Sequence, residues 1–503
     1  MSPLVAGVDC STQATKVLVV DPDTGSVEAT GRGAHEVTGT GGARETDPEV
    51  WWQALRTALD QTGTAAELDA ISVAGQQHGL VVTDEDGRPL RPAILWNDTR
   101  SAPQARELTT AFGGPEAWAE RIGVVPVPSF TATRWAWLRE GEPDVAAAAR
   151  AVRLPHDFLT ERLSGRGATD RGDASGTAWW STRDERYSDE VLDLIDLDPA
   201  LLPHVLGPEE TAGEVSGEAA EALGLRAGAL VGPGTGDNQG AALGVGATPG
   251  QPVVSLGTSG TAYAVMEERT VDPSGTVAGF ADASGRFLPL AATLNATLAV
   301  DRVAGWLGLD RETAAERTSV VMLPYLDGER TPNLPKAAGM IAGLRHATTR
   351  DEILLAAYEG AAASLIEALQ QLSRLGSGLD PDSPLILVGG GARGAVWQRT
   401  VARLSGRRVR VPDAEELVAL GAAAQAAACL TGERPDAVAR RWGTAGGIDV
   451  DPPDEEDTET LARIKATREA TLRLHEEAER QAEAPAPGFS PAVSRGRSSD
   501  PPT

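Results

Sequence analysis

Cysteine is scarce in this sequence, and long apolar runs are missing from it. The 503 residues include two cysteines, Cys10 and Cys429, and neither belongs to a CxxC pair or to a Cys/His spacing. Two isolated cysteines exclude a disulfide framework and a zinc site, and they favour a reducing compartment. The chain has no apolar run of about 18 residues, which a membrane span would need, and no signal-peptide pattern at its start. We therefore expect a cytoplasmic protein.

Positive charge is also in short supply. Lys and Arg total 45 against 72 Asp and Glu, which gives a net charge of −27. This balance argues against nucleic acid and against an anionic membrane surface as partners. It does not exclude ATP, because backbone N–H groups, a few cations and Mg²⁺ can hold phosphates. Small molecules are the expected partners; the sequence does not determine the oligomeric state, for which a homodimer is one option.

The length and the pattern of apolar residues predict two α/β domains. A chain of 503 residues exceeds the size at which a single core stops growing, so a cleft between domains is expected. Short apolar runs alternate with helical patterns, which is typical of α/β domains. The predicted strands are 70–74, 80–83, 93–96 and 385–388, and the predicted helices are 48–60, 351–375, 395–404 and 417–430.

Changes in composition predict where the domains end. Glycines and Pro249 interrupt the pattern in residues 244–251, which places an N-terminal domain at 1–247 and a C-terminal domain at 248–450. Residues 451–483 are highly charged and predict a helical tail, while 484–503 are rich in Pro, Ser and Gly and are expected to be disordered.

Two strand-turn-strand units, in residues 4–20 and 252–266, indicate a duplicated architecture with two phosphate-binding turns. In the first, Asp9 can hold Mg²⁺ directly or through water, and Lys16 can offset phosphate charge. In the second, the turn from Gly257 to Thr261 offers glycines and hydroxyls. Each turn alone is as well explained by the ordinary preference of Asp, Ser and Thr for turns. Together they indicate two hairpins that hold one polyphosphate from opposite sides.

A third glycine cluster, Gly389-Gly390-Gly391-Ala392, follows the predicted strand 385–388. Its missing side chains allow a flat ligand such as adenine to approach the backbone, although a tight strand-to-helix turn would need the same residues. No GxxxxGK[ST] motif occurs, and the glycines do not form a GxGxxG that opens a first βαβ unit. P-loop and Rossmann sites are therefore disfavoured.

Asp237 is the predicted catalytic base. It lies where the glycine-rich segment 231–236 runs into a predicted helix, so it could be only a helix N-cap. A helix N-terminus also keeps a carboxylate ionised, and an ionised carboxylate can accept the proton of a substrate hydroxyl that attacks ATP.

Two polar clusters that follow predicted strands suggest a sugar site. Residues 75–79 read GQQHG, with Gln77 and His78, and residues 96–100 read WNDTR. Sugar hydroxyls need several directed hydrogen bonds, and sugar C–H faces pack on aromatic rings. The simpler alternatives are a structural His78 and a Trp96 in the core.

The sequence resembles the FGGY carbohydrate kinases over most of residues 4–430. The matching stretches are GQQHG at 75–79, LWND at 95–98, LPHDFL at 154–159, DASGTAWW at 173–180, GDNQGAALGVG at 236–246, SLGTSGT at 255–261, LPYLDGERTP at 323–332 and VGGGAR at 388–393. The resemblance implies two domains of the actin-like, ribonuclease H-like ATPase fold, with ATP and sugar in the interdomain cleft. The implied site residues are Asp237 as base, Gln77, His78 and Asn238 on the sugar, Asp9 near Mg²⁺ and the phosphates, and Thr12, Thr258, Gly390 and Gly391 on the nucleotide.

Within this family, the GQQHG and LWND segments favour the members that phosphorylate D-xylulose to D-xylulose 5-phosphate. The alternatives are a sister kinase for L-ribulose, glycerol or gluconate, an actin-like or Hsp70-like ATPase without a sugar substrate, and a nucleotide-binding regulator that has lost catalysis. Two positions depart from the family pattern. Ser11 stands where a glycine usually precedes the threonine, and Ala395 stands where some relatives carry a polar contact.

Overall fold

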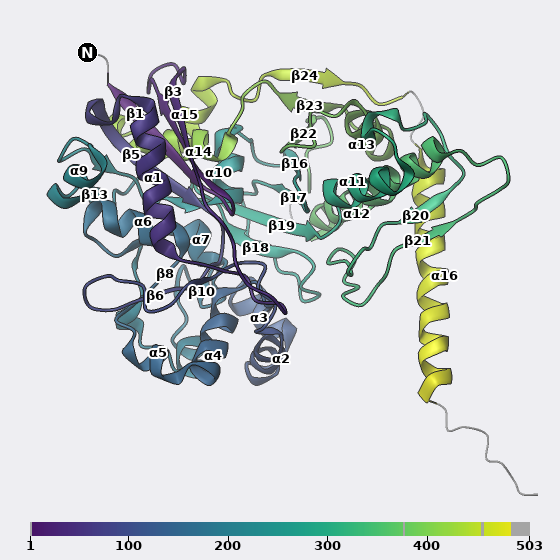
Figure 1. Cartoon of the computed structure of the whole chain (residues 1–503), viewed down its shortest axis with the longest axis horizontal. Helices are drawn as coiled ribbons and strands as arrows, with labels where there is room; N and C mark the ends of the chain where they lie inside the picture. Colours follow the sequence, from purple (N-terminus) through teal and green to yellow (C-terminus); the bar gives the residue numbers. More distant parts are fainter. Residues whose placement is uncertain (1–2, 376–377, 454–456, 484–503) are drawn as a thin grey trace, which may run out of the picture.

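Two α/β halves lie side by side in the computed structural model, each built around a mixed seven-stranded sheet (Figure 1). The structure describes residues 3–375, 378–453 and 457–483, so the predicted disorder of residues 484–503 lies outside the described residues. Residues 245–251, where the domain boundary was predicted, connect the helix α10 (Asp237–Gly244) to the strand β16 (Pro252–Leu256), the first strand of the second sheet.

The first sheet has the order β13-β14-β5-β1-β2-β3, with β15 paired to β5. Its strands are β1 (Leu4–Cys10), β2 (Ala14–Val20), β3 (Val27–Ala34), β5 (Leu68–Gly75), β13 (Gly213–Glu214), β14 (Leu230–Val231) and β15 (Thr235–Gly236). β1 and β2 form an antiparallel hairpin that pairs Cys10 with Thr15, and β5 runs parallel to β1 on its other side. Both faces of β1 are buried, which explains its nearly continuous apolar sequence.

The second sheet repeats this arrangement, in the order β18-β19-β17-β16-β22-β23-β24. Its other strands are β17 (Gly260–Ala264), β18 (Ala278–Ala281), β19 (Phe287–Thr293), β22 (Leu385–Val388), β23 (Val409–Pro412) and β24 (Gly447–Val450). β16 and β17 form an antiparallel hairpin that pairs Leu256 with Gly260, and β22 runs parallel to β16. The predicted second strand-turn-strand unit is therefore confirmed.

Helices cover the sheets and form a separate cluster at the lower left of Figure 1. In the first half they are α1 (Pro48–Thr62), α2 (Ala102–Ala111), α3 (Pro115–Arg121), α4 (Thr131–Gly141), α5 (Pro143–Ala148), α6 (Pro155–Ser164), α7 (Arg171–Ser175), α8 (Asp189–Leu194) and α9 (Gly217–Leu223). In the second half they are α11 (Thr297–Leu307), α12 (Arg350–Leu375), α13 (Ala395–Ser405), α14 (Leu417–Thr431), α15 (Pro435–Trp442) and α16 (Thr458–Glu483). The Asp47 side chain caps α1, and Gly63 ends it in the left-handed conformation.

Helix α14 comes late in the chain but packs on the first half, against β1, β5 and α10. Glycines make the crossing of α10 and α14 close: a Cβ built on Gly421 would lie 1.9 Å from the carbonyl oxygen of Gly240. One built on Gly7 of β1 would lie 1.9 Å from the carbonyl oxygen of Ala419. These contacts fix α10, and with it Asp237 at its first turn, between the two sheets.

The predicted charged tail helix is α16, which continues beyond the rest of the second half in Figure 1. Its first turns pack on α12 and β20 (Val321–Leu323) through the buried Ile464 and an Arg468–Glu367 ion pair of 2.5 Å. Among the described residues, no helix combines the length and apolar character needed to cross a bilayer.

Candidate active site

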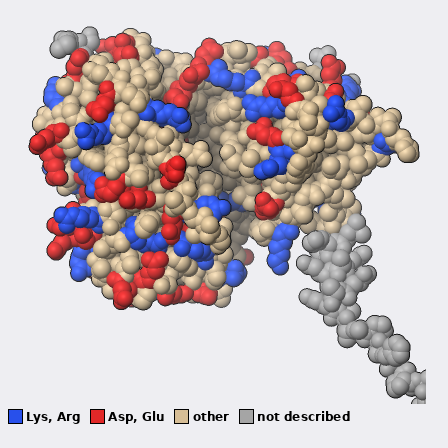
Figure 2. Space-filling model, in the orientation of Figure 1, with Lys and Arg blue, Asp and Glu red and all other residues tan. Residues whose placement is uncertain are grey.

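A cavity of about 220 Å³ lies between the two halves. Figure 2 shows the molecule hollowed between them, with acidic and basic side chains interspersed over the rest of that face. The cavity is lined from the first half by Gln77, His78, Trp96, Asp237 and Asn238, and from the second by Ser255, Gly257, Ser259, Thr261 and Arg330. The predicted sugar residues and the predicted base therefore share one cavity with the second predicted phosphate turn.

Asp237 is the first residue of α10, and its N-cap is Gly236. The alternative that Asp237 is the N-cap is therefore wrong. Its Oδ1 accepts a hydrogen bond of 2.8 Å from the Asn238 amide. Burial, together with the negative charges of Asp9 and Asp173, raises the pKa of Asp237 to about 7.

Burial opposes the expected effect of the helix N-terminus on Asp237. It raises the pKa of the carboxyl to about 7, whereas the helix N-terminus favours the ionised form. The physical reason is that the cost of removing a charge from water exceeds the stabilisation that a helix terminus offers.

A chain of amide side chains holds the residues beside Asp237. The Asn238 amide donates to Gln77 Oε1 at 2.7 Å, and the Gln77 amide donates to Gln239 Oε1 at 2.8 Å. From the second sheet, the Thr261 hydroxyl donates to Asn238 Oδ1 at 3.3 Å. Gln77 and Asn238, which were both predicted to bind the sugar, therefore belong to one hydrogen-bonded network that connects the two halves.

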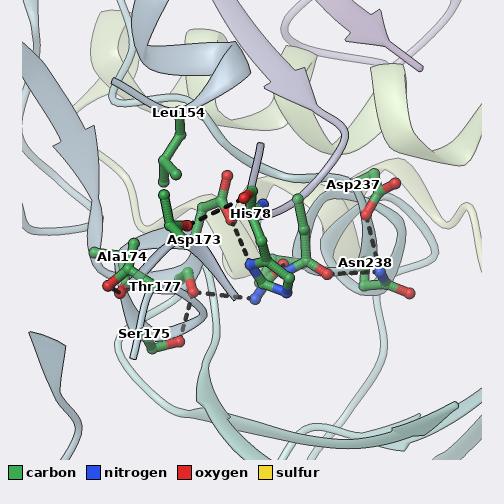
Figure 3. A network of polar contacts seen from close by, with 12 residues as sticks. His78, Leu154, Asp173, Ala174, Ser175, Thr177, Asp237 and Asn238 are labelled. Atoms are coloured by element: carbon green, nitrogen blue, oxygen red, sulfur yellow. Dashed lines mark hydrogen bonds and ion pairs between the residues drawn. The ribbon is translucent and has the colours of Figure 1, made fainter. Parts of the chain in front are cut away.

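His78, the fourth residue of GQQHG, has an uncommon backbone conformation. Its φ of 64° lies in the left-handed region, which few residues other than glycine adopt. The backbone N–H donates to Asp173 Oδ1 at 3.4 Å, and the ring Nδ1 lies 3.4 Å from the same oxygen (Figure 3). The ring packs against both Phe130 and Phe280, each with its centroid at 5.3 Å.

Burial, with the positive charges of Arg134 and Arg330, holds the pKa of His78 well below its ordinary value. The lowered pKa favours the neutral imidazole in its contact with Asp173. The Nδ1 atom is buried and, among the described residues, forms no hydrogen bond. A Cβ built on Gly176 would lie 1.8 Å from the His78 ring, so the glycine of DASGT leaves room for the imidazole.

Behind His78 lies a buried cluster of one histidine and three carboxylates. His156 Nε2 is 3.2 Å from Asp157 and 3.5 Å from both Asp170 and Asp173. Burial raises the pKa of Asp157 and Asp173 to about 7 and that of Asp170 to about 6. No role was predicted for these residues from the sequence. Their only signal was membership of the LPHDFL and DASGTAWW stretches and the segment between them.

The first predicted phosphate turn gathers charge around Asp9. The Ser11 hydroxyl donates to Asp9 Oδ1 at 2.6 Å, so the serine that departs from the family pattern contacts the predicted metal ligand. Lys16 Nζ lies 3.8 Å from Asp9 and 2.5 Å from Glu416 at the start of α14. Burial raises the pKa of Asp9 to about 6. Thr12 Oγ1 accepts a hydrogen bond from the Trp96 indole at 3.2 Å. Trp96 itself lines the cavity, so the alternative that it belongs to the core is wrong.

The structure brings the second turn and the glycine cluster together at the ends of the neighbouring strands β16 and β22. Gly391 N donates to the Leu256 carbonyl at 3.0 Å, and the Thr297 hydroxyl of α11 donates to the Gly257 carbonyl at 2.8 Å. A Cβ on Gly390 would meet no atom within 4 Å, so the space above this glycine is open. Asp9, Thr12, Lys16, Thr258, Gly390 and Gly391 do not line the cavity around Asp237.

Comparisons with known proteins agree with this architecture. The model of the FGGY family of carbohydrate kinases, N-terminal domain, matches residues 4–244, and that of the C-terminal domain matches residues 253–430. Xylulose kinases from Streptomyces coelicolor and Streptomyces rubiginosus are each 60% identical over 463 residues, which cover 92% of this chain and 95% of theirs. The crystal structure of xylulose kinase from Bifidobacterium adolescentis superposes with a TM-score of 0.77 at 36% identity, covering 88% of this chain and 99% of that one.

Proposed function

The chain belongs to the FGGY family of carbohydrate kinases, and we propose that it transfers the γ-phosphoryl group of ATP to a hydroxyl of D-xylulose. The product would be D-xylulose 5-phosphate, which makes the protein a xylulokinase. The single observation that carries this choice of sugar is the 60% identity to two xylulose kinases over 92% of the chain. The cavity supports it with amide, imidazole and carboxylate groups that suit a polyhydroxy substrate.

Asp237 is the proposed general base. Its carboxylate lies in the cavity, and its pKa of about 7 matches the operating pH at which a base accepts a proton most effectively. Gln77, His78 and Asn238 orient the sugar, because their side chains are fixed by the amide chain and by Asp173. A neutral His78 contributes directed hydrogen bonds without placing a positive charge beside the base.

The nucleotide side is proposed to consist of the two turns and the glycine cluster. Hydroxyls and N–H groups near Thr12, Gly257 and Thr258 contact phosphates, Lys16 offsets their charge, and Gly390 and Gly391 leave room for adenine. For Lys16 this means sharing its ammonium between phosphate, Asp9 and Glu416, which both lie within 4 Å of it.

The residues around Asp9 fit a Mg²⁺ ion. A buried carboxylate with its pKa raised to about 6 gains from a nearby cation. Mg²⁺ is commonly bound by one or two carboxylates together with water and substrate phosphates. Asp9 would hold the ion, directly or through water. When bound, the ion would neutralise charge on the phosphates during transfer.

The test is a measurement of ADP release with D-xylulose, L-ribulose, glycerol, gluconate and no sugar. We expect the highest kcat/KM with D-xylulose and only slow release without sugar. Preference for another sugar would replace D-xylulose within the same family. Release that does not depend on sugar would contradict the kinase proposal and favour an ATPase.

The domain boundaries and the oligomeric state stay predictions.

A further inference from the structure

Arg330 is a cationic residue of the cavity for which no role was predicted from the sequence. It belongs to the LPYLDGERTP stretch, lies on the loop between β20 and β21 (Met340–Ala342), and is half-buried. Among the described residues, its guanidinium forms no ion pair and no hydrogen bond. Three other groups of the cavity wall, the N–H donors of Asn238, Gln77 and Trp96, already have acceptors within the protein. Arg330 therefore keeps its donors for a ligand.

The loop on both sides of Arg330 is fixed to the end of β19. Glu329 is 1% exposed and accepts hydrogen bonds from Leu294 N at 2.6 Å and Asn295 Nδ2 at 3.0 Å. It also accepts from the backbone N–H of Arg330 at 2.8 Å. On the other side, the Thr331 hydroxyl donates to the Ala292 carbonyl at 2.8 Å. Leu294 and Ala292 themselves line the cavity, so the backbone of Arg330 is anchored to the cavity wall.

The guanidinium is close enough to His78 to act on its ionisation. The positive charge of Arg330 contributes to the lowered pKa of His78. Burial lowers the pKa of Arg330 itself. Arg330 lines the same cavity as the predicted sugar residues Gln77 and His78.

We propose that Arg330 is a substrate-binding residue that donates hydrogen bonds to oxygens of the sugar. This inference rests on the proposed kinase function. In an open-chain ketopentose, the carbonyl and its neighbouring hydroxyl are adjacent acceptor oxygens. A guanidinium presents parallel N–H groups in a rigid fork, which suits two adjacent acceptor oxygens. Half-burial strengthens such bonds, because water competes less for the donors.

The test compares Arg330→Met and Arg330→Lys with the unchanged protein. Arg330→Met keeps much of the side-chain bulk but removes charge and donors. We expect its KM for D-xylulose to rise about 10- to 100-fold, with kcat within about threefold and the KM for ATP unchanged. Arg330→Lys keeps the charge without the fork, so an intermediate loss is expected. The matched control is Arg226→Met, because Arg226 is a surface residue paired with Asp69 outside the cavity.

Inhibition by D-xylulose 5-phosphate distinguishes a contact with the sugar from a contact with the transferred group. If Arg330 contacts sugar oxygens, its loss weakens the binding of sugar and of sugar phosphate by the same factor. A much larger loss for the phosphate, or a lower kcat at unchanged KM, would place Arg330 on the transferred phosphoryl group and overturn the proposal. Unchanged constants in Arg330→Met would overturn it as well.

Failure of the proposed function has a separate signature, because it appears in the unchanged protein. Turnover with a sugar other than D-xylulose replaces the substrate, and the same comparison is then made with that sugar and its phosphate. Absence of turnover with every sugar overturns both proposals. Thermal melting of each variant, together with its affinity for ATP, separates a loss of sugar binding from a loss of folding.

Discussion

Replacing Asp237 by Asn should lower turnover and, at the same time, stabilise the folded protein. The change keeps the size of the side chain and removes its basicity. We expect kcat to fall by roughly a hundredfold to ten-thousandfold, the usual contribution of a general base. The opposite effect on stability follows from the partly buried position of the carboxyl, whose pKa rises from 3.8 to about 7 on folding.

The sign of the stability effect depends on which state binds the proton. Between about pH 4 and pH 7 the unfolded chain has lost the Asp237 proton while the folded protein still holds it. The free energy of unfolding therefore falls as pH rises through this window. A difference of about three pH units, at about 1.4 kcal/mol each, corresponds to a loss on the order of 4 kcal/mol above pH 7. Asp237→Asn should recover part of this loss, and the recovery should vanish below about pH 4.

The same ionisation should appear in the pH profile of the reaction. Because the base must be deprotonated, kcat/KM for the sugar should fall about tenfold per pH unit below pH 7 and level off above it. In Asp237→Asn this fall of kcat/KM below pH 7 should disappear. Any remaining fall on the acid side of the profile should occur at lower pH and reflect Asp9, whose pKa is about 6.

The assay is ADP release with D-xylulose between pH 5.5 and 8.5, combined with thermal melting over the same range. Asp86→Asn is the matched control, because Asp86 is exposed and pairs with Arg88 on the surface. Turnover of Asp237→Asn within about threefold of the unchanged protein would refute the assignment of the base. A melting temperature that does not rise at pH 8 would refute the reasoning from burial.

Three further substitutions test the nucleotide side, the carboxylate cluster and the helix crossing. Thr258→Trp should raise the KM for ATP about tenfold or more and leave sugar binding intact; an unchanged ATP affinity would count against this turn. Asp173→Asn removes a negative charge that raises the pKa of Asp237, so the acid limb should move to lower pH and the KM for sugar should rise. An unmoved limb would mean that Asp173 is only structural. Gly421→Ala places a Cβ 1.9 Å from the carbonyl oxygen of Gly240 and should lower both the melting temperature and kcat. The control is Gly305→Ala on α11, whose added Cβ meets open space and should leave both unchanged. Equal behaviour of the two variants would contradict the close crossing of α10 and α14.

The sequence predicted those features that local chemistry determines. The two hairpins, the glycine turn after β22 and the helices α1, α12, α13 and α14 were each expected within a few residues of their bounds. The two-domain α/β fold is confirmed as well. Turn residues and apolar periodicity act over a few positions, so one sequence is enough to recognise them.

The parts that were missed depend on contacts between distant segments. Asp173 and Arg330 act on His78 from 95 and 252 positions away in the sequence. Neither residue stands out by type, because buried aspartates and loop arginines occur throughout the chain. The raised pKa of Asp237 likewise depends on how deeply the fold buries it, which local sequence does not determine. Only the stretches shared with the family pointed to these positions.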